Sequence, residues 1–263
     1  SDTVLYLIHP RGFTCHSSSG VQHRGTYAGI TEKLPYLKEL GITAVELMPS
    51  YEFLELEKQE RRERSMDEAR NHYMDLPEKE DEPPRINYWG YKRGYYFAPK
   101  MSYSASDCPA EEFKDMVKAL HREGLEIVIE LFFDGKEAPA YVLDAARFWA
   151  HEYHVDGIHL VGHAPVKLLG EDPYLSRLKL FAPDWEGVDP GACRHLARYN
   201  DGFMMDMRGL LKGDEGHLDH LAFHTRNHPE KVGVINYMAN TNGFTMMDMV
   251  SYDRKHNEAN GED

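Results

Sequence analysis

Hydrophobic residues in this chain follow two alternating patterns. Between short apolar runs, apolar residues recur every three or four positions, as on one face of an amphipathic helix. Strand-like runs that alternate with such helices favour a parallel sheet built from βα units. The runs that we predict to be strands cover residues 4–9, 42–49, 125–133, 157–162, 177–185, 199–209 and 232–240.

Three segments between these runs are predicted to be helices. The first begins at Thr31, whose side chain can cap the free amides of the first turn, and ends at Gly41. The third covers residues 141–154 and precedes the run at 157–162. The second, residues 109–124, has four apolar residues on one face, namely Phe113, Met116, Val117 and Leu120.

Seven predicted strands at this spacing favour a TIM (β/α)8-type barrel that lacks, or is truncated before, its eighth βα unit. An open doubly wound sheet is the alternative, but no GxGxxG turn follows the first strand. We expect residues 1–263 to form a single domain with a charged insertion around residues 52–86. In a barrel of this kind the chemistry lies at the carboxyl ends of the strands, so the residues there are the candidates for a site.

Charge and composition narrow the classes of function. The net charge of −14 disfavours binding to nucleic acid, whose phosphates it would repel. No run approaches the roughly 18 apolar residues of a membrane helix, so no membrane partner is predicted. A cytoplasmic protein is favoured, but secretion stays open because the chain begins at Ser1 rather than Met. Cys15, Cys108 and Cys193 are predicted to be free buried thiols.

Five colinear segments carry a resemblance to a known family: GTYAGITEKLPYLKELGITAVELMP, NYWGYKRGYYFAP, EFKDMVKALHREGLEIVIE, WAHEYHVDG and GFTMMDMVSYDRKHNEANGED. They resemble the catalytic barrel of the α-amylase superfamily, glycoside hydrolase family 13. Within it the chain is similar to the glycogen-debranching, isoamylase and pullulanase group. The resemblance implies action on α-1,6 branch linkages of α-glucans and no organic cofactor. Some members bind calcium, which nothing else in this sequence supports.

The catalytic groups of that family are replaced in this chain. The family pattern DGFRFD aligns with DGIHLV, so that His159 stands for the arginine and Val161 for the nucleophile. An isopropyl group cannot form a glycosyl ester. In KLFAPDWE the general acid becomes Pro183, which has no proton to donate, and in ANTNGFTM the His-Asp pair becomes Thr241 and Asn242. A fourth strand end, ELFFDG, has lost a histidine that contacts substrate.

These replacements predict a barrel of α-glucan metabolism that is catalytically inactive, a pseudoenzyme that can retain glucan binding or a regulatory role. An α-glucan or maltooligosaccharide is the predicted partner. Tyr91 aligns with a family tyrosine that stacks on a glucose ring, and the other predicted contacts are Trp89, His159 and Thr241. Packing of these aromatic residues between loop and barrel is the simpler alternative.

Two other functions stay open. The first is an active debranching-type hydrolase with relocated carboxylates, for which the candidates are Glu130, Asp134, Asp156, Asp184, Glu186 and Asp206. The second is a structural or interaction module without sugar affinity. Further domains or a second copy of the chain would complete the barrel in each case.

Histidines raise the question of a metal. The segment GHLDHLAFH contains His217, Asp219, His220 and His224, and the last two share a helical face. That spacing alone is weak support, and the glutamate of an HExxH motif is missing. We therefore predict exposed histidines without a ligand, and no metal site.

Overall fold

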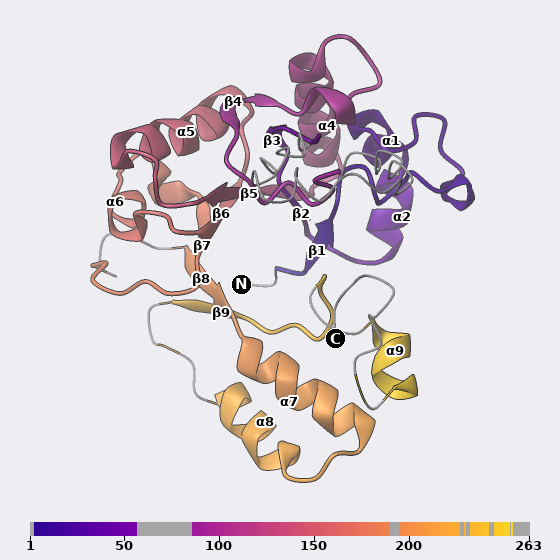
Figure 1. Cartoon of the computed structure of the whole chain (residues 1–263), viewed down its shortest axis with the longest axis vertical. Coiled ribbons are helices and arrows are strands. Elements are labelled where there is room, and N and C mark those ends of the chain that lie inside the picture. The colour runs from indigo at the N-terminus through magenta and orange to yellow at the C-terminus, as the bar shows by residue number, and fades with distance from the viewer. Residues whose placement is uncertain are drawn as a thin grey trace, which may run out of the picture.

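The computed structural model describes residues 3–56, 86–189, 195–226, 229, 232–241, 245–252 and 254. Its main sheet has seven parallel strands in the order β1-β2-β5-β6-β7-β8-β9. The sheet curls into a half-barrel with β1 and β9 at its two edges (Figure 1). The predicted fold class is therefore confirmed. The strands are β1 Leu5–Ile8, β2 Ala44–Leu47, β5 Glu126–Phe133, β6 Gly157–Gly162, β7 Lys179–Phe181, β8 Leu196–Tyr199 and β9 Gly233–Ile235.

Helices α1, α2, α4, α5 and α6 lie around the outside of the sheet, whereas α7 and α8 extend from the end of β8 (Figure 1). The helices are α1 Tyr27–Glu32, α2 Leu34–Glu39, α4 Pro109–Arg122, α5 Pro139–Glu152, α6 Val166–Gly170, α7 Asp201–Lys212, α8 His217–Arg226 and α9 Met246–Ser251. Short 3-10 helices cover Ser17–Ser19, Met101–Tyr103 and Leu175–Arg177. Within the described residues, no helix combines the length and apolarity needed to span a bilayer.

A second sheet of two strands is separate from the main one. It pairs β3 (Tyr51–Glu52) with β4 (Tyr95–Pro99) in antiparallel fashion. These strands flank the predicted charged insertion, of which residues 57–85 lie outside the described residues.

The core lies between the half-barrel and its outer helices. All four apolar residues predicted for one face of α4 are buried, and Phe113 and Trp149 of α5 meet edge to face at 5.2 Å. The indole nitrogen of Trp149 donates to the Tyr96 carbonyl oxygen at 2.7 Å, which satisfies its one polar group inside the core.

Two predicted elements are wrong in detail. The first helix begins at Tyr27 rather than Thr31, because Thr26 caps it by accepting a hydrogen bond from the Gly29 amide. Thr31 lies inside α1 and donates to the Tyr27 carbonyl oxygen. The predicted strand at 199–209 is mostly helix α7, whose start is capped by Asn200, and the sixth parallel strand is instead β8.

The cysteine prediction also needs correction. Cys15 and Cys108 are free but exposed, rather than buried. Cys193 lies outside the described residues.

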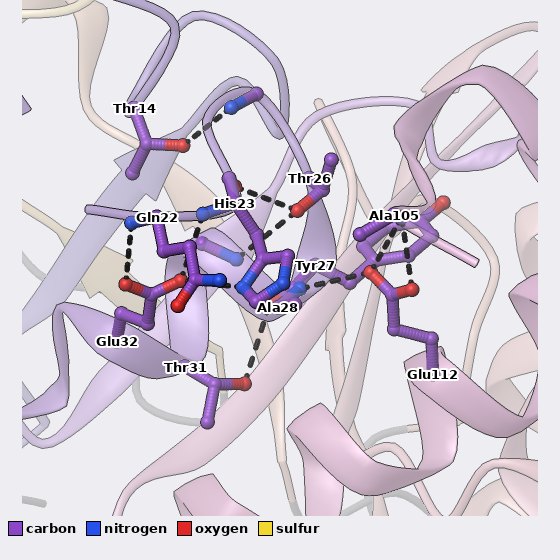
Figure 2. A network of polar contacts seen from close by, with 12 residues as sticks. Thr14, Gln22, His23, Thr26, Tyr27, Ala28, Thr31, Glu32, Ala105 and Glu112 are labelled. Carbon is purple, nitrogen blue, oxygen red and sulfur yellow. Dashed lines mark hydrogen bonds and ion pairs between the residues drawn. The ribbon is translucent and has the colours of Figure 1, made fainter. Parts of the chain in front are cut away.

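The Glu112 side chain ties α1 to α4 (Figure 2). One carboxylate oxygen accepts a hydrogen bond from the Ala28 amide, and both accept from the Ala105 amide at 2.9–3.0 Å. Ser104 and Ser106 donate to the same group. Burial raises the pKa of Glu112, but these hydrogen bonds outweigh it and hold the pKa below its ordinary value of 4.5.

We expect Glu112→Gln to lower the free energy of unfolding by about 1–3 kcal/mol at pH 7. The substitution removes a partly buried carboxylate that accepts hydrogen bonds from several backbone amides. A carboxyl with a lowered folded-state pKa stabilises the fold above its unfolded pKa, and this contribution is lost as the pH falls through the folded pKa. The deficit of the variant should therefore shrink below about pH 4.5 in urea unfolding.

Glu111→Gln is the matched control, because the Glu111 side chain is 69% exposed. Its effect should stay within about 0.5 kcal/mol. Equal losses in the two variants, or a deficit for Glu112→Gln that does not change with pH, would contradict the role assigned to Glu112.

Candidate functional site

Three titratable side chains from three neighbouring strands meet inside the half-barrel. Glu46 lies on β2, Glu130 on β5 and His159 on β6. Glu130 and His159 are directly paired in the β5–β6 register, so their side chains point to the same face of the sheet. Glu46 is 0% exposed and Glu130 3%. Two carboxyl groups are thus removed from water close to one imidazole.

Each carboxyl group has one oxygen directed to His159 and the other to a tyrosine. His159 Nδ1 lies 2.7 Å from Glu46 Oε1 and 3.8 Å from Glu130 Oε1. The Tyr91 hydroxyl donates to Glu130 Oε2 at 2.6 Å, and the Tyr199 hydroxyl donates to Glu46 Oε2. Both oxygens of each carboxyl group therefore have a partner.

Burial and mutual charge set the ionisation of this cluster. Burial, followed by the charge of the neighbouring Glu46, raises the pKa of Glu130 to about 7. Burial lowers the pKa of His159, but the hydrogen bond and charge of Glu46 outweigh it, so the pKa lies above its ordinary value. Burial also raises the pKa of Tyr91 and Tyr199, which remain neutral donors.

Glu130 and His159 of this cluster form part of the wall of a cavity of about 390 Å³ at the carboxyl ends of the strands. Tyr237 stands beside it and donates a hydrogen bond to Asp201 Oδ1 at 2.5 Å. The Tyr237 ring meets the Tyr199 ring edge to face, with the ring centroids 5.2 Å apart. The described residues that line this pocket are Leu7, Tyr91, Glu130, Phe132, His159, Val161, Ala182, Pro183, Tyr199, Asp201, Tyr237 and Asn240.

The structure gathers most, but not all, of the predicted site residues in this pocket. Val161, Pro183, Tyr91 and His159 line it. Trp89 does not: it is 46% exposed and packs edge to face against His9 at 5.7 Å. Thr241 is exposed and also outside the lining, and Asn242 lies outside the described residues.

The predicted relocated carboxylates are scattered. Of the six, Glu130 alone lines the pocket. Asp156 lies at the opposite end of β6, where it accepts from the Ile127 amide at 2.8 Å. Pattern reasoning missed Glu46, Tyr199, Asp201 and Tyr237. All four lie within predicted strand runs, at residues 42–49, 199–209 and 232–240, and that position was the available signal.

The three histidines of the segment GHLDHLAFH all lie near one carboxylate. That carboxylate belongs to Asp206 and not to Asp219 of the same segment. His217 Nδ1 lies 2.9 Å from Asp206 Oδ1 on α7. His220 and His224 approach the same carboxylate at 3.7 and 3.4 Å. The histidines of α8 therefore pair with α7, and His220 remains 73% exposed.

A second cavity, of about 650 Å³, lies on the open side of the half-barrel. It is lined by residues of both edge strands, including Leu5 and Leu7 of β1 and Val234 and Ile235 of β9. In a closed barrel, a further strand would lie on this side, between β9 and β1.

We expect Tyr199→Phe to lower the free energy of unfolding by about 1.5–3 kcal/mol, because a buried carboxylate loses its donor. Tyr95→Phe is the matched control, since Tyr95 is 59% exposed. It should change stability by less than about 0.5 kcal/mol in the same urea titration. If Tyr199→Phe changed the free energy of unfolding as little as the control does, the hydrogen bond from Tyr199 to Glu46 would not stabilise the fold.

Comparisons with known proteins show which proteins this chain is similar to. Residues 7–134 match the family model "Alpha amylase, catalytic domain". Isoamylase 3, chloroplastic, of Oryza sativa subsp. japonica is 28% identical, over 100% of this chain and 42% of its own length. A glycogen operon protein GlgX homolog of Mycobacterium tuberculosis (strain ATCC 25618 / H37Rv) is 27% identical over 99% of this chain and 44% of its own.

Solved structures agree on the fold. A pullulanase from Paenibacillus barengoltzii, in complex with maltohexaose and α-cyclodextrin, matches with a TM-score of 0.61 at 22% identity, over 83% of this chain and 44% of that one. The pneumococcal glycogen-degrading protein SpuA matches with a TM-score of 0.67 at 17% identity, over 95% and 32%. The chain spans less than half the length of these relatives. The chain therefore has a fold similar to that of the debranching-type enzymes of glycoside hydrolase family 13.

Proposed function

We propose that this chain is a non-hydrolysing α-glucan-binding barrel. The observation that carries the proposal is the pocket itself. Val161 and Pro183 line it at the positions that the family pattern gives to the nucleophile and the general acid, while its aromatic and hydroxyl-bearing walls are kept.

Hydrolysis by the family's mechanism needs groups that these positions lack. A retaining glycosidase uses two carboxyl groups about 5–5.5 Å apart, one as nucleophile and one as acid. The side chains of Val161 and Pro183 have neither a lone pair nor an acidic proton. Glu130, which lines the pocket, is already engaged by Tyr91 and His159.

The walls suit a sugar. Faces of aromatic rings pack against the C–H faces of pyranose rings, and hydroxyl, amide and carboxylate groups bond their edges. Tyr91, Tyr199 and Tyr237 supply the rings, while Asp201 and Asn240 stand beside them. A volume of about 390 Å³ lies in the range of ordinary ligand pockets. Relatives named for isoamylase, GlgX and pullulanase make an α-glucan the preferred sugar.

A second candidate function is hydrolysis by relocated carboxyl groups. Glu130 and Asp201 both line the pocket, and burial raises the pKa of Glu130 to about 7, which suits a general acid. The hydrogen bond from Tyr237 to Asp201 and that from Tyr91 to Glu130 oppose this function, because both carboxyl groups would have to leave a partner.

Calorimetric titration with maltohexaose tests the proposal, together with an assay of reducing ends released from pullulan and glycogen. We expect binding heat and no product. Val161→Trp should weaken binding at least about tenfold, because the indole fills the pocket, and a tenfold change corresponds to about 1.4 kcal/mol. Leu54→Trp is the matched control, since Leu54 is 63% exposed; it should bind as the parent does.

Three results would contradict the proposal. Product formation that is lost in Asp201→Asn would establish the relocated-carboxyl hydrolase instead. Absence of heat at millimolar maltohexaose would favour a structural module without sugar affinity. Unchanged affinity in Val161→Trp would place the sugar elsewhere on the surface.

A further inference from the structure

We propose that Glu46, Glu130 and His159 form a site for a divalent transition-metal ion, with its open face toward the pocket. The proposal does not rest on glucan binding, and it differs from the expectation drawn from sequence, which was no metal site. Among the described residues, these three form the one group of His, Cys, Asp or Glu whose ligand atoms all lie within 4.8 Å of one another.

The separations between the ligand atoms suit a metal. In a tetrahedral site with bonds of about 2.0–2.2 Å, neighbouring ligand atoms are about 3.4 Å apart. His159 Nδ1 lies 2.7 Å from Glu46 Oε1 and 3.8 Å from Glu130 Oε1, values on either side of that distance. The ligand atoms of all three residues lie within 4.8 Å of one another, so that one ion could contact all of them after small side-chain shifts.

Contacts outside the triad hold the ligands in place. The Tyr91 and Tyr199 hydroxyls bond the outer oxygens, Oε2, of the two glutamates, so that both Oε1 atoms remain directed at His159 Nδ1. The His159 ring is also stacked on Tyr199, with ring centroids 5.1 Å apart. Ligating carboxylates in metal sites are oriented by hydrogen bonds of this kind.

The charge of the cluster supports a cation. Two buried carboxyl groups face a single imidazole, and none of the described residues lining the pocket is a lysine or arginine. Buried carboxylates need compensation by an opposite charge or a metal. A divalent ion would balance both glutamates with His159 as a neutral ligand. Each of the three residues comes from a different strand of the same sheet, so the sheet itself places the three ligands.

The donor set indicates which metals would bind. One imidazole nitrogen with two carboxylate oxygens suits Zn²⁺, Co²⁺ or Mn²⁺ better than Ca²⁺, which prefers a larger set of oxygens. Glu130 and His159 line the pocket, so the remaining coordination position would be open to water there. Three protein ligands and one open position are the arrangement of an accessible, rather than closed, metal site.

The histidines around Asp206 are a competing place for a metal, and any experiment must separate the two. His220→Gln/His224→Gln removes two of those histidines and leaves the triad untouched, and we call this variant the background protein. It would be freed of metal with a chelator and titrated with Zn²⁺ or Co²⁺ alone, by calorimetry. We expect about one equivalent to bind.

Variants of the background protein then locate that equivalent. Glu130→Gln and His159→Gln should each weaken binding at least about tenfold, and Tyr91→Phe should weaken it about 10–100-fold through lost orientation of Glu130. Asp134→Asn is the matched control: this carboxylate follows the same strand but accepts from the Lys136 amide, so its affinity for metal should be unchanged. Circular dichroism checks the fold of each variant.

A spectroscopic measurement needs no variant of the triad. In the Co²⁺-loaded background protein, one imidazole ligand bound through Nδ1 should give one strongly shifted, exchangeable N–H proton signal, from His159 Nε2. No binding below millimolar metal, no shifted N–H signal, or binding undiminished in a folded Glu130→Gln would each overturn the proposal. Because glucan is absent throughout, these results leave the maltohexaose titration to decide the proposed function separately.

Discussion

Two buried carboxyl groups facing one imidazole are the contact on which the rest of the pocket depends. A charged group without a partner in this position would be costly, so Glu46 and Glu130 fix the side chains around them. His159 turns its Nδ1 to both, Tyr199 holds Glu46 and Tyr91 holds Glu130. The tyrosines that bound the pocket are thus anchored by their hydroxyls and present their rings to the cavity.

The half-barrel places this contact. Parallel neighbours β2, β5 and β6 bring residues that are far apart in the chain to one interior face, and the strand ends open onto the same cavity. At those ends stand Val161 and Pro183, which offer shape but no acid–base chemistry. An active glycosidase combines a substrate pocket with reactive groups at the strand ends. This chain has the pocket, but Val161 and Pro183 supply no reactive group there.

Much of the fold follows from local patterns in the sequence. Apolar runs such as residues 125–133 predict strands because a buried parallel strand must be apolar on both faces. The prediction fails at residues 199–209, where a helix capped by Asn200 follows a strand that is only four residues long. Thr31 does not cap the first helix, because Thr26, five residues earlier, is its N-cap.

The site could be predicted only in part. Val161, Pro183, His159 and Tyr91 emerge from the family pattern, and all four line the pocket. Glu46 was hidden because its role depends on its distance from His159, which is 113 positions away in the chain. Register between strands sets that distance, and no local pattern reveals it.

The central claim is that an α-glucan occupies the pocket beside Val161 and leaves it unchanged. A crystal structure of this chain soaked with maltohexaose tests it most directly. We expect an uncleaved saccharide packed against Tyr91, Tyr199 or Tyr237, with Val161 near its ring. A shortened saccharide in the pocket, or sugar bound only outside it, would show that the pocket does not bind an α-glucan without cleaving it.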